Sequence, residues 1–145
     1  MAKWTKFPHP EAAYVYTAAT LKKNWARLHK GDCEAFPKDD SVTEAWIAFH
    51  AGDFEKACTL GLSAGDAGIT VANKAANIYA TYLEKSDKKK LELYQEVAER
   101  CEQLQATDKK NPNAFYGYAY AIGRYSQGIS VTKALAQGLG GKVKD

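Results

Sequence analysis

Two short breaks, each ending in an acidic residue, divide the central part of the chain into amphipathic helical stretches. Gly52-Asp53 and Ser86-Asp87 lie 34 residues apart. Glycine can adopt the left-handed conformation that finishes a helix, and serine or aspartate can accept hydrogen bonds from the first backbone N–H groups of the next helix. Since a break this short leaves two helices antiparallel and side by side, each break predicts a helical hairpin.

Apolar residues around the two breaks recur every three or four positions, which is the spacing of one helix face. They predict a pair of helices over 41–65 and a second, longer pair over 66–107. The apolar faces comprise Val42, Ala45, Trp46 and Phe49; Phe54, Ala57, Cys58 and Gly61; Ala72, Ala75, Ala76, Tyr79, Tyr82 and Leu83; and Leu91, Tyr94, Val97, Ala98, Cys101 and Leu104. No stretch sustains the alternation of a β-strand, so we expect an all-α fold.

Helices are also predicted on both sides of these two pairs. An N-terminal helix is expected within residues 1–32, starting near His9-Pro10, because proline is tolerated in a first turn. A third pair is expected over 111–139, opening after Asn111-Pro112. Its two apolar faces are Phe115, Tyr118, Ala119, Ile122 and Tyr125, and Val131, Ala134, Leu135 and Leu139. Residues 1–145 are therefore predicted to form one domain of stacked antiparallel hairpins.

The charge pattern limits the classes of partner. The chain of 145 residues has a formal charge of +3, with basic residues in excess at both ends and acidic residues in excess over 31–66. No segment is basic enough for nucleic-acid binding, and the acidic middle would repel phosphate. No apolar run approaches the roughly 20 residues of a membrane helix, and the first residues lack the apolar core of a signal peptide. We therefore expect a cytoplasmic protein, unless a leader was removed, with neither nucleic acid nor membrane as a partner.

The first and third pairs resemble the tetratricopeptide repeat (TPR) family, in which helix pairs recur about every 34 residues. The resemblance is carried by Ala45, Gly52-Asp53-Phe54, Ala57 and Ala64, and by Asn111-Pro112, Phe115, Tyr118, Ala119 and Ile122. Residues 91–128 are similar, more faintly, to the degenerate repeats of regulator-of-microtubule-dynamics-like proteins, from which we transfer no function. The TPR resemblance implies a short, irregular superhelix whose first helices line a concave surface that binds a protein or peptide.

Six polar or aromatic residues on the predicted first helices lie off the apolar faces. They are Asn73 and Asn77 in the second pair, and Asn113, Tyr116, Tyr120 and Arg124 in the third. Asparagine can donate to and accept from a peptide backbone, tyrosine supplies contact area, and arginine can hold a carboxylate through two hydrogen bonds. We expect these residues to grip an extended peptide or a partner helix. The alternative is that the tyrosines pack against a neighbouring helix and the asparagines are merely solvated.

Other kinds of site find little support in the sequence. His29 and Cys33 are four residues apart, but Gly31-Asp32 interrupts the helix that would align them, and His50 has no second ligand one turn later. Since no nucleophile elbow or phosphate-binding loop occurs either, no metal, cofactor or catalytic site is predicted. A solenoid normally ends with a polar capping helix, which the third pair lacks. We therefore expect a non-enzymatic interaction module or scaffold, or alternatively a structural unit that forms a homodimer through that pair.

Overall fold

The computed structural model describes residues 4–8, 12–32 and 34–136, with side chains as far as Ile129. No β-strand occurs among these residues, and the predicted all-α fold is confirmed. The α-helices are α1 (Ala18–Leu28), α2 (Asp40–His50), α3 (Phe54–Ser63), α4 (Ile69–Tyr82), α5 (Asp87–Thr107) and α6 (Pro112–Ala136). Two short 3-10 helices, η1 (Ala12–Tyr14) and η2 (Gly65–Gly68), precede α1 and α4.

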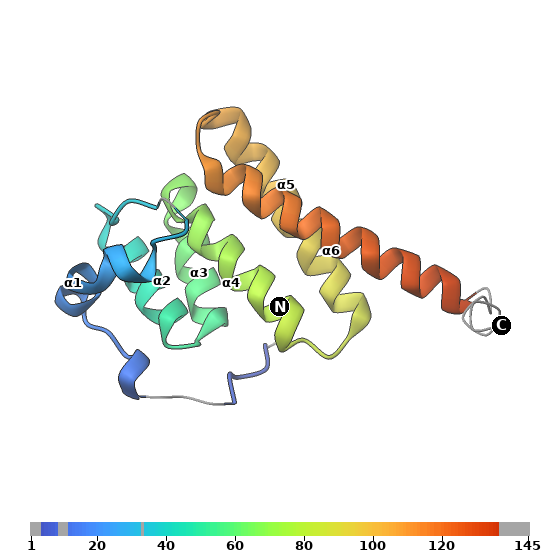
Figure 1. The fold of residues 1–145 in the computed structure, drawn as a ribbon, viewed down its shortest axis with the longest axis horizontal. Coiled ribbons are helices and arrows are strands. Elements are labelled where there is room, and N and C mark those ends of the chain that lie inside the picture. Colours follow the sequence, from blue (N-terminus) through green and yellow to red (C-terminus); the bar gives the residue numbers. More distant parts are fainter. Residues whose placement is uncertain (1–3, 9–11, 33, 137–145) are drawn as a thin grey trace.

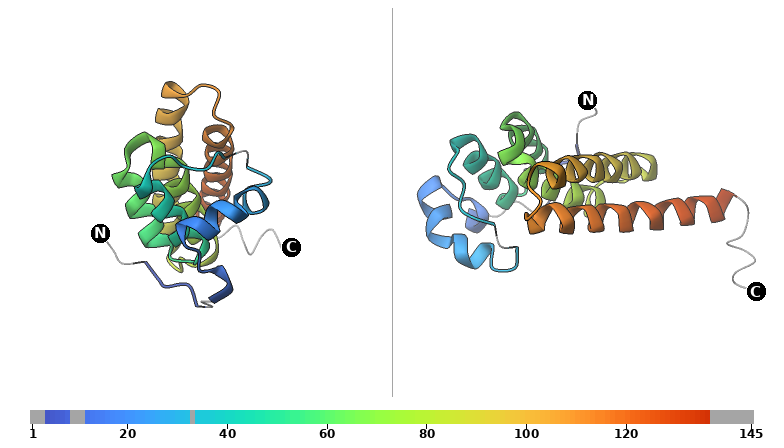
Figure 2. Two further views of the ribbon diagram at one scale, coloured as in Figure 1. Left: turned by 90° about the vertical axis from the view of Figure 1, so that its left-hand side faces the viewer. Right: turned by 90° about the horizontal axis from the view of Figure 1, so that it is seen from above.

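From α2 onward, each helix packs against the next and runs roughly antiparallel to it (Figure 1). Helices α2 and α3 occupy the predicted first pair, and α4 and α5 occupy the second. Helix α4 also contacts both α2 and α6, so it lies between these two alternate helices. Helix α6 continues past the beginning of α5, as Figure 1 and the right-hand view of Figure 2 show.

Both predicted breaks have the expected local chemistry. Gly52 has a φ of +86°, and the Asp53 side chain caps α3 by accepting the Lys56 N–H at 3.2 Å. The Ser86 hydroxyl caps α5 in the same way, accepting the Lys89 N–H at 3.3 Å. A Cβ added to Gly52 would also come within 2.7 Å of the Phe7 ring. Positive φ and this close contact together explain why glycine occupies the first break.

The N-terminal helix is shorter than predicted. Helix α1 begins only at Ala18, because Thr17 and Thr20 form a capping box that fixes its start. The preceding Tyr14 and Val15 are 52% and 65% exposed, so they bury no apolar face that would hold a longer helix. His9-Pro10, the predicted starting point, lies outside the described residues. The expectation of one helix running from there to the end of residues 1–32 is therefore wrong.

The predicted third helix pair over 111–139 is wrong in a more informative way. Residues 112–136 form the single helix α6, with no turn near Gly128. Gly128 instead permits close packing on α5, since a Cβ there would lie 2.7 Å from Leu91 Cδ2. The expected end of the pair, including Leu139, lies outside the described residues.

Two of the glycines in α6, Gly123 and Gly128, should respond differently to alanine substitution. Nothing lies within 4 Å of a Cβ added to Gly123, so Gly123→Ala should raise the free energy of unfolding by about 1 kcal/mol through helix propensity. Gly128→Ala should gain distinctly less, because Leu91 must move aside. Urea denaturation of both variants measures the difference. Equal gains would contradict the packing of Gly128 on α5.

Two clusters of buried side chains form most of the core. The first joins α1, α2, α3 and the beginning of α4 and contains Trp46, which is 1% exposed. The second joins α4, α5 and α6. Trp4, from the N-terminal segment, packs against both clusters and stacks on Tyr79 with ring centroids 4.4 Å apart. None of the described helices combines the length and apolarity needed to cross a bilayer.

Candidate ligand-binding pocket

A pocket with a volume of about 190 Å³ opens where α2, α4 and α6 meet. Five of the six predicted site residues line it: Asn73, Asn77, Asn113, Tyr116 and Tyr120. The side chains of Phe49 on α2 and of Lys74 and Ile78 on α4 complete much of the wall. The helix spacing that identified the candidates therefore brings most of them to one place. Whether they bind a ligand stays a prediction.

Asn73 is already committed to interactions within the protein. It is 4% exposed, its Oδ1 accepts a hydrogen bond from Arg100 Nε at 2.8 Å, and its Nδ2 donates to Cys101 Sγ at 3.3 Å. Both partners belong to α5, so the Asn73 amide joins α4 to α5. The alternative interpretation of this residue as a solvated side chain is wrong.

Asn77, one helical turn further along α4, is in a different situation. It is 6% exposed, so it too is not solvated, yet its buried Oδ1 has no hydrogen-bond partner among the described residues. A buried acceptor left unpaired costs about 1–3 kcal/mol. The pocket is the space into which this amide can reach a partner from outside the chain.

Asn113 attaches the beginning of α6 to the loop that follows α1. Its Nδ2 donates to Glu34 Oε2 at 2.7 Å. Burial raises the pKa of the Glu34 carboxyl above its usual value, and the hydrogen bond from Asn113 opposes that rise. Asn113 thus helps to hold one side of the pocket in place.

The two candidate tyrosines differ in how firmly they are held. The hydroxyl of Tyr120 is 2.7 Å from Thr81 Oγ1, which is also 2.7 Å from the hydroxyl of Tyr94. Tyr116 is 66% exposed and forms an open side of the pocket. The alternative that the tyrosines pack against a neighbouring helix therefore describes Tyr120 better than Tyr116.

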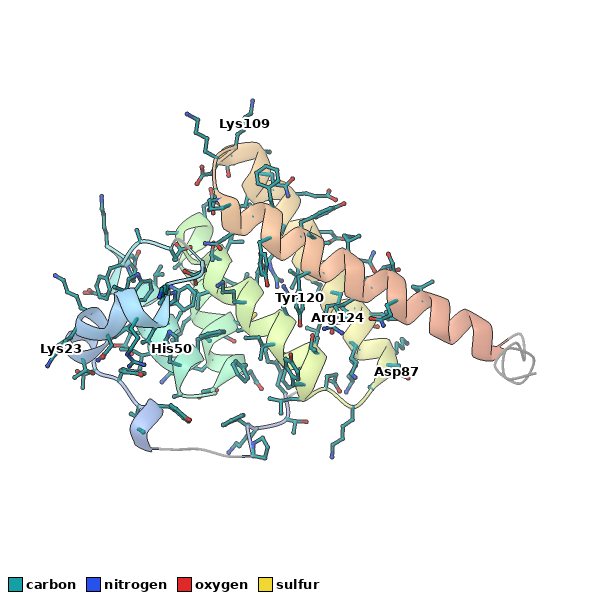
Figure 3. The ribbon with its side chains drawn as sticks, viewed as in Figure 1. Lys23, His50, Asp87, Lys109, Tyr120 and Arg124 are labelled. Carbon is teal, nitrogen blue, oxygen red and sulfur yellow. The ribbon has the colours of Figure 1, made fainter. Side chains whose placement is uncertain are left out.

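Arg124 is the predicted site residue that the structure separates from the others. Its guanidinium carbon lies 5.4 Å from the centre of the Tyr120 ring, a cation–π distance. It lines a different hollow, of about 250 Å³, between α6 and the beginning of α5. Figure 3 labels Tyr120 and Arg124 in succession along α6. Arg124 is thus adjacent to the pocket without belonging to it.

A polar network that the sequence patterns did not reveal lies directly beside the pocket. Lys74 Nζ donates to Asp32 Oδ2 at 2.7 Å, and His29 Nδ1 is 2.8 Å from the same oxygen. His29 Nε2 is in turn 3.0 Å from His50 Nε2. A repeated spacing could have revealed this network, because tryptophan precedes histidine by four residues in both Trp25–His29 and Trp46–His50. The rings of each pair stack, with centroids 3.7 and 6.0 Å apart.

Protonation of this network follows from its surroundings. Burial would raise the pKa of Asp32, but hydrogen bonds from Lys74, the Glu34 backbone and His29 outweigh it and lower that pKa. Burial lowers the pKa of His29, and burial together with the charge of His29 lowers that of His50 to about 4. Both imidazoles are therefore neutral at pH 7, with His29 donating to Asp32 and His50 donating to His29.

Other features of the described residues are less suited to a compact ligand. Two larger hollows, of about 610 and 570 Å³, lie beside the N-terminal segment and beside the 34–39 loop. Neither contains a buried side chain with an unpaired polar atom among those described. Across all the residues that the structure describes, no group of three or more histidine, cysteine or acidic side chains is placed so that it could hold a metal ion.

Comparisons with protein families, curated proteins and solved structures give no match to this chain. We therefore infer its function from the geometry of the pocket and the chemistry of the side chains around it.

Proposed function

We propose that the protein is a non-enzymatic interaction module, TPR-like in its stacking, that binds a segment of a partner protein or a peptide in the α2–α4–α6 pocket. One observation carries the proposal. Predicted ligand-contacting residues from α4 and α6 converge on a single pocket, and one of them, Asn77, has a buried amide oxygen without a partner among the described residues. The expected cytoplasmic location stays a prediction alongside it.

The order in which the helices pack supports this proposal. A TPR-like stack requires each helix to contact the next, and each first helix to contact the first helix of the following pair. Here α2 contacts α4, and α4 contacts α6, in addition to the sequential contacts. The pocket is lined by these three helices, which would be the first helices of successive repeats, with α6 opening a third.

The titratable groups near the pocket favour binding over catalysis. Lys74 is paired with Asp32, and His29 and His50 use their Nε2 atoms on one another. Burial raises the pKa of the Cys101 thiol to about 11, so this thiol is not a nucleophile at neutral pH. The side chains left available at the opening, chiefly Tyr116, are of the kind that anchor protein interfaces.

Removing Tyr116 should weaken ligand binding strongly. Peptides selected from a random library against the wild-type protein are expected to bind Tyr116→Ala at least about tenfold more weakly, because the ring forms an open side of the pocket. Titration calorimetry measures the change. Phe115→Ala is the matched control, since Phe115 is 50% exposed, adjacent, and outside the pocket lining. Equal effects of the two substitutions, or no selectable peptide, would contradict the proposal.

A second candidate function is self-association through the end of α6. The observation that favours it is the length of α6, which has 25 residues whereas α5 has 21. The last turns of α6 extend past α5 (Figure 1), and Ile129 is 40% exposed. If the protein instead binds a partner segment in the α2–α4–α6 pocket, we expect light scattering after size-exclusion chromatography to report a monomer. A dimer that Ile129→Lys dissociates would favour the structural unit instead.

A further inference from the structure

We infer that the α2–α4–α6 pocket accepts one aromatic ring carrying a neutral hydrogen-bond donor, with the side chain of a tyrosine in the partner as the best match. The donor would bond to Asn77 Oδ1. This inference rests on the proposed function and names the chemistry of the residue that the partner inserts.

The size of the pocket limits the ligand to about one ring. An apolar cavity of about 150 Å³ is large enough to hold benzene. The present pocket, at about 190 Å³, has room for a ring with a small substituent. A stretch of folded peptide would not fit within it, although the remainder of a peptide could continue across the exposed Tyr116.

The walls favour an aromatic ring over an aliphatic chain. Phe49 contributes from α2, Ile78 from α4, and Tyr116 and Tyr120 from α6. Aromatic side chains attract one another in offset or edge-to-face arrangements in addition to burying apolar area. Three aromatic walls around a ring-sized space therefore match a ring better than they match a leucine or a methionine.

The polar atoms then select the substituent. Several nearby polar groups are already engaged, namely Asn73 with Arg100 and Cys101, and the Tyr120 hydroxyl with Thr81. Asn77 Oδ1 alone remains a buried acceptor without a partner among the described side chains, so the complementary ligand atom is a donor. Lys74 also lines the pocket, and its positive charge disfavours an ammonium or guanidinium donor. A phenol hydroxyl satisfies both conditions.

The test compares small molecules that differ by this one donor. We would titrate the full chain with p-cresol, which represents the tyrosine side chain, and with toluene, which lacks only the hydroxyl, and follow backbone amide shifts by NMR. The wild-type protein should bind p-cresol about five- to tenfold more tightly, the factor that one net hydrogen bond supplies. Equal affinities, or tighter binding of toluene, would overturn the inference. An N–H donor can be compared by adding 3-methylindole, which should bind less tightly than p-cresol because it is larger.

Two variants separate the contribution of the hydrogen bond to Asn77 from that of the contact with the Tyr116 ring. Asn77→Leu keeps the number and branching of the side-chain heavy atoms but removes the acceptor, so p-cresol should lose its advantage while toluene still binds. Tyr116→Ala should weaken both compounds, and because Tyr116 is exposed, this variant should fold normally. Persistence of the p-cresol preference in Asn77→Leu would refute the assignment of the donor to Asn77.

Failure of this inference can be told apart from failure of the proposed function. Library peptides that depend on Tyr116 but carry neither tyrosine nor tryptophan would overturn the inference and leave the interaction module standing. The predicted order of p-cresol over toluene, with no peptide selected at all, would support the chemistry of the pocket and count against a peptide as its ligand.

Discussion

Lowering the pH from 7 to 5 is expected to reduce the free energy of unfolding by about 2 kcal/mol through His50 alone. The pKa of His50 falls from 6.5 to about 4 on folding, because burial and the neighbouring His29 disfavour its charged form. Between about pH 6.5 and pH 4, His50 is therefore protonated in the unfolded chain but stays neutral in the folded protein. This stability is complete above that range and is lost as the pH falls toward 4.

His29 and the carboxyl groups near the two histidines change this pH-dependent loss of stability in a direction that follows from their pKa shifts. The lowered pKa of His29 adds to it, whereas the raised pKa of Glu34 opposes it near pH 5. Asp32 keeps its charge throughout this range, because its pKa lies below the ordinary value of a carboxyl group.

Urea denaturation at pH 7, 6 and 5 measures the effect. The control is His50→Gln, which retains an N–H donor for His29 but does not titrate. We expect the pH-dependent loss to shrink by more than half in this variant. A wild-type stability that is constant from pH 7 to pH 5, or an equal loss in His50→Gln, would contradict the buried neutral pair.

The second large effect is a gain in stability at the expense of binding. Asn77→Leu should raise the free energy of unfolding by about 1–2 kcal/mol, since it replaces a buried, unpaired amide by an apolar side chain of similar size. The same substitution should weaken the binding of any ligand whose donor reaches Asn77. Such an opposition between stability and function is typical of residues kept for a ligand.

Asn73→Leu is the matched control for this second prediction. Asn73 is equally buried, one turn away on the same helix, but its amide is bonded to Arg100 and Cys101. The change should therefore lower the free energy of unfolding by about 2 kcal/mol, because it leaves the Arg100 guanidinium short of a partner. Fluorescence-monitored denaturation distinguishes the two. Destabilisation of similar size in both variants would show that Asn77 is bonded within the protein.

The helix boundaries that the sequence predicted correctly are those with a local cause. Gly52 ends one helix, and Asp53 and Ser86 each cap the next helix through atoms of neighbouring residues, so their sequence neighbourhood is sufficient. The break expected between Tyr125 and Val131 does not exist, and Gly128, which lies between them, instead packs against Leu91 of another helix. A glycine that ends a helix and one that lets two helices approach look the same in a single sequence.

The same distinction applies to the pocket. Helical spacing is enough to place Asn77 on one face of α4, and Tyr116 and Tyr120 on one face of α6, two faces that meet in the structure. Spacing could not show that Arg100 donates a hydrogen bond to the Asn73 amide or that Arg124 lies over the Tyr120 ring, since both contacts depend on side-chain directions. The network of Lys74, Asp32 and the two histidines joins three separate segments, and only the repeated tryptophan–histidine spacing hinted at it.

The central claim is that the α2–α4–α6 pocket is the place where a partner binds. Amide chemical-shift mapping with the tightest library peptide tests it most directly. We predict that the largest changes cluster at Phe49, Asn77, Tyr116 and their neighbours, and that they shrink in Tyr116→Ala but not in Phe115→Ala. Changes confined to the end of α6 around Ile129, or to the face covered by Trp4, would contradict the claim.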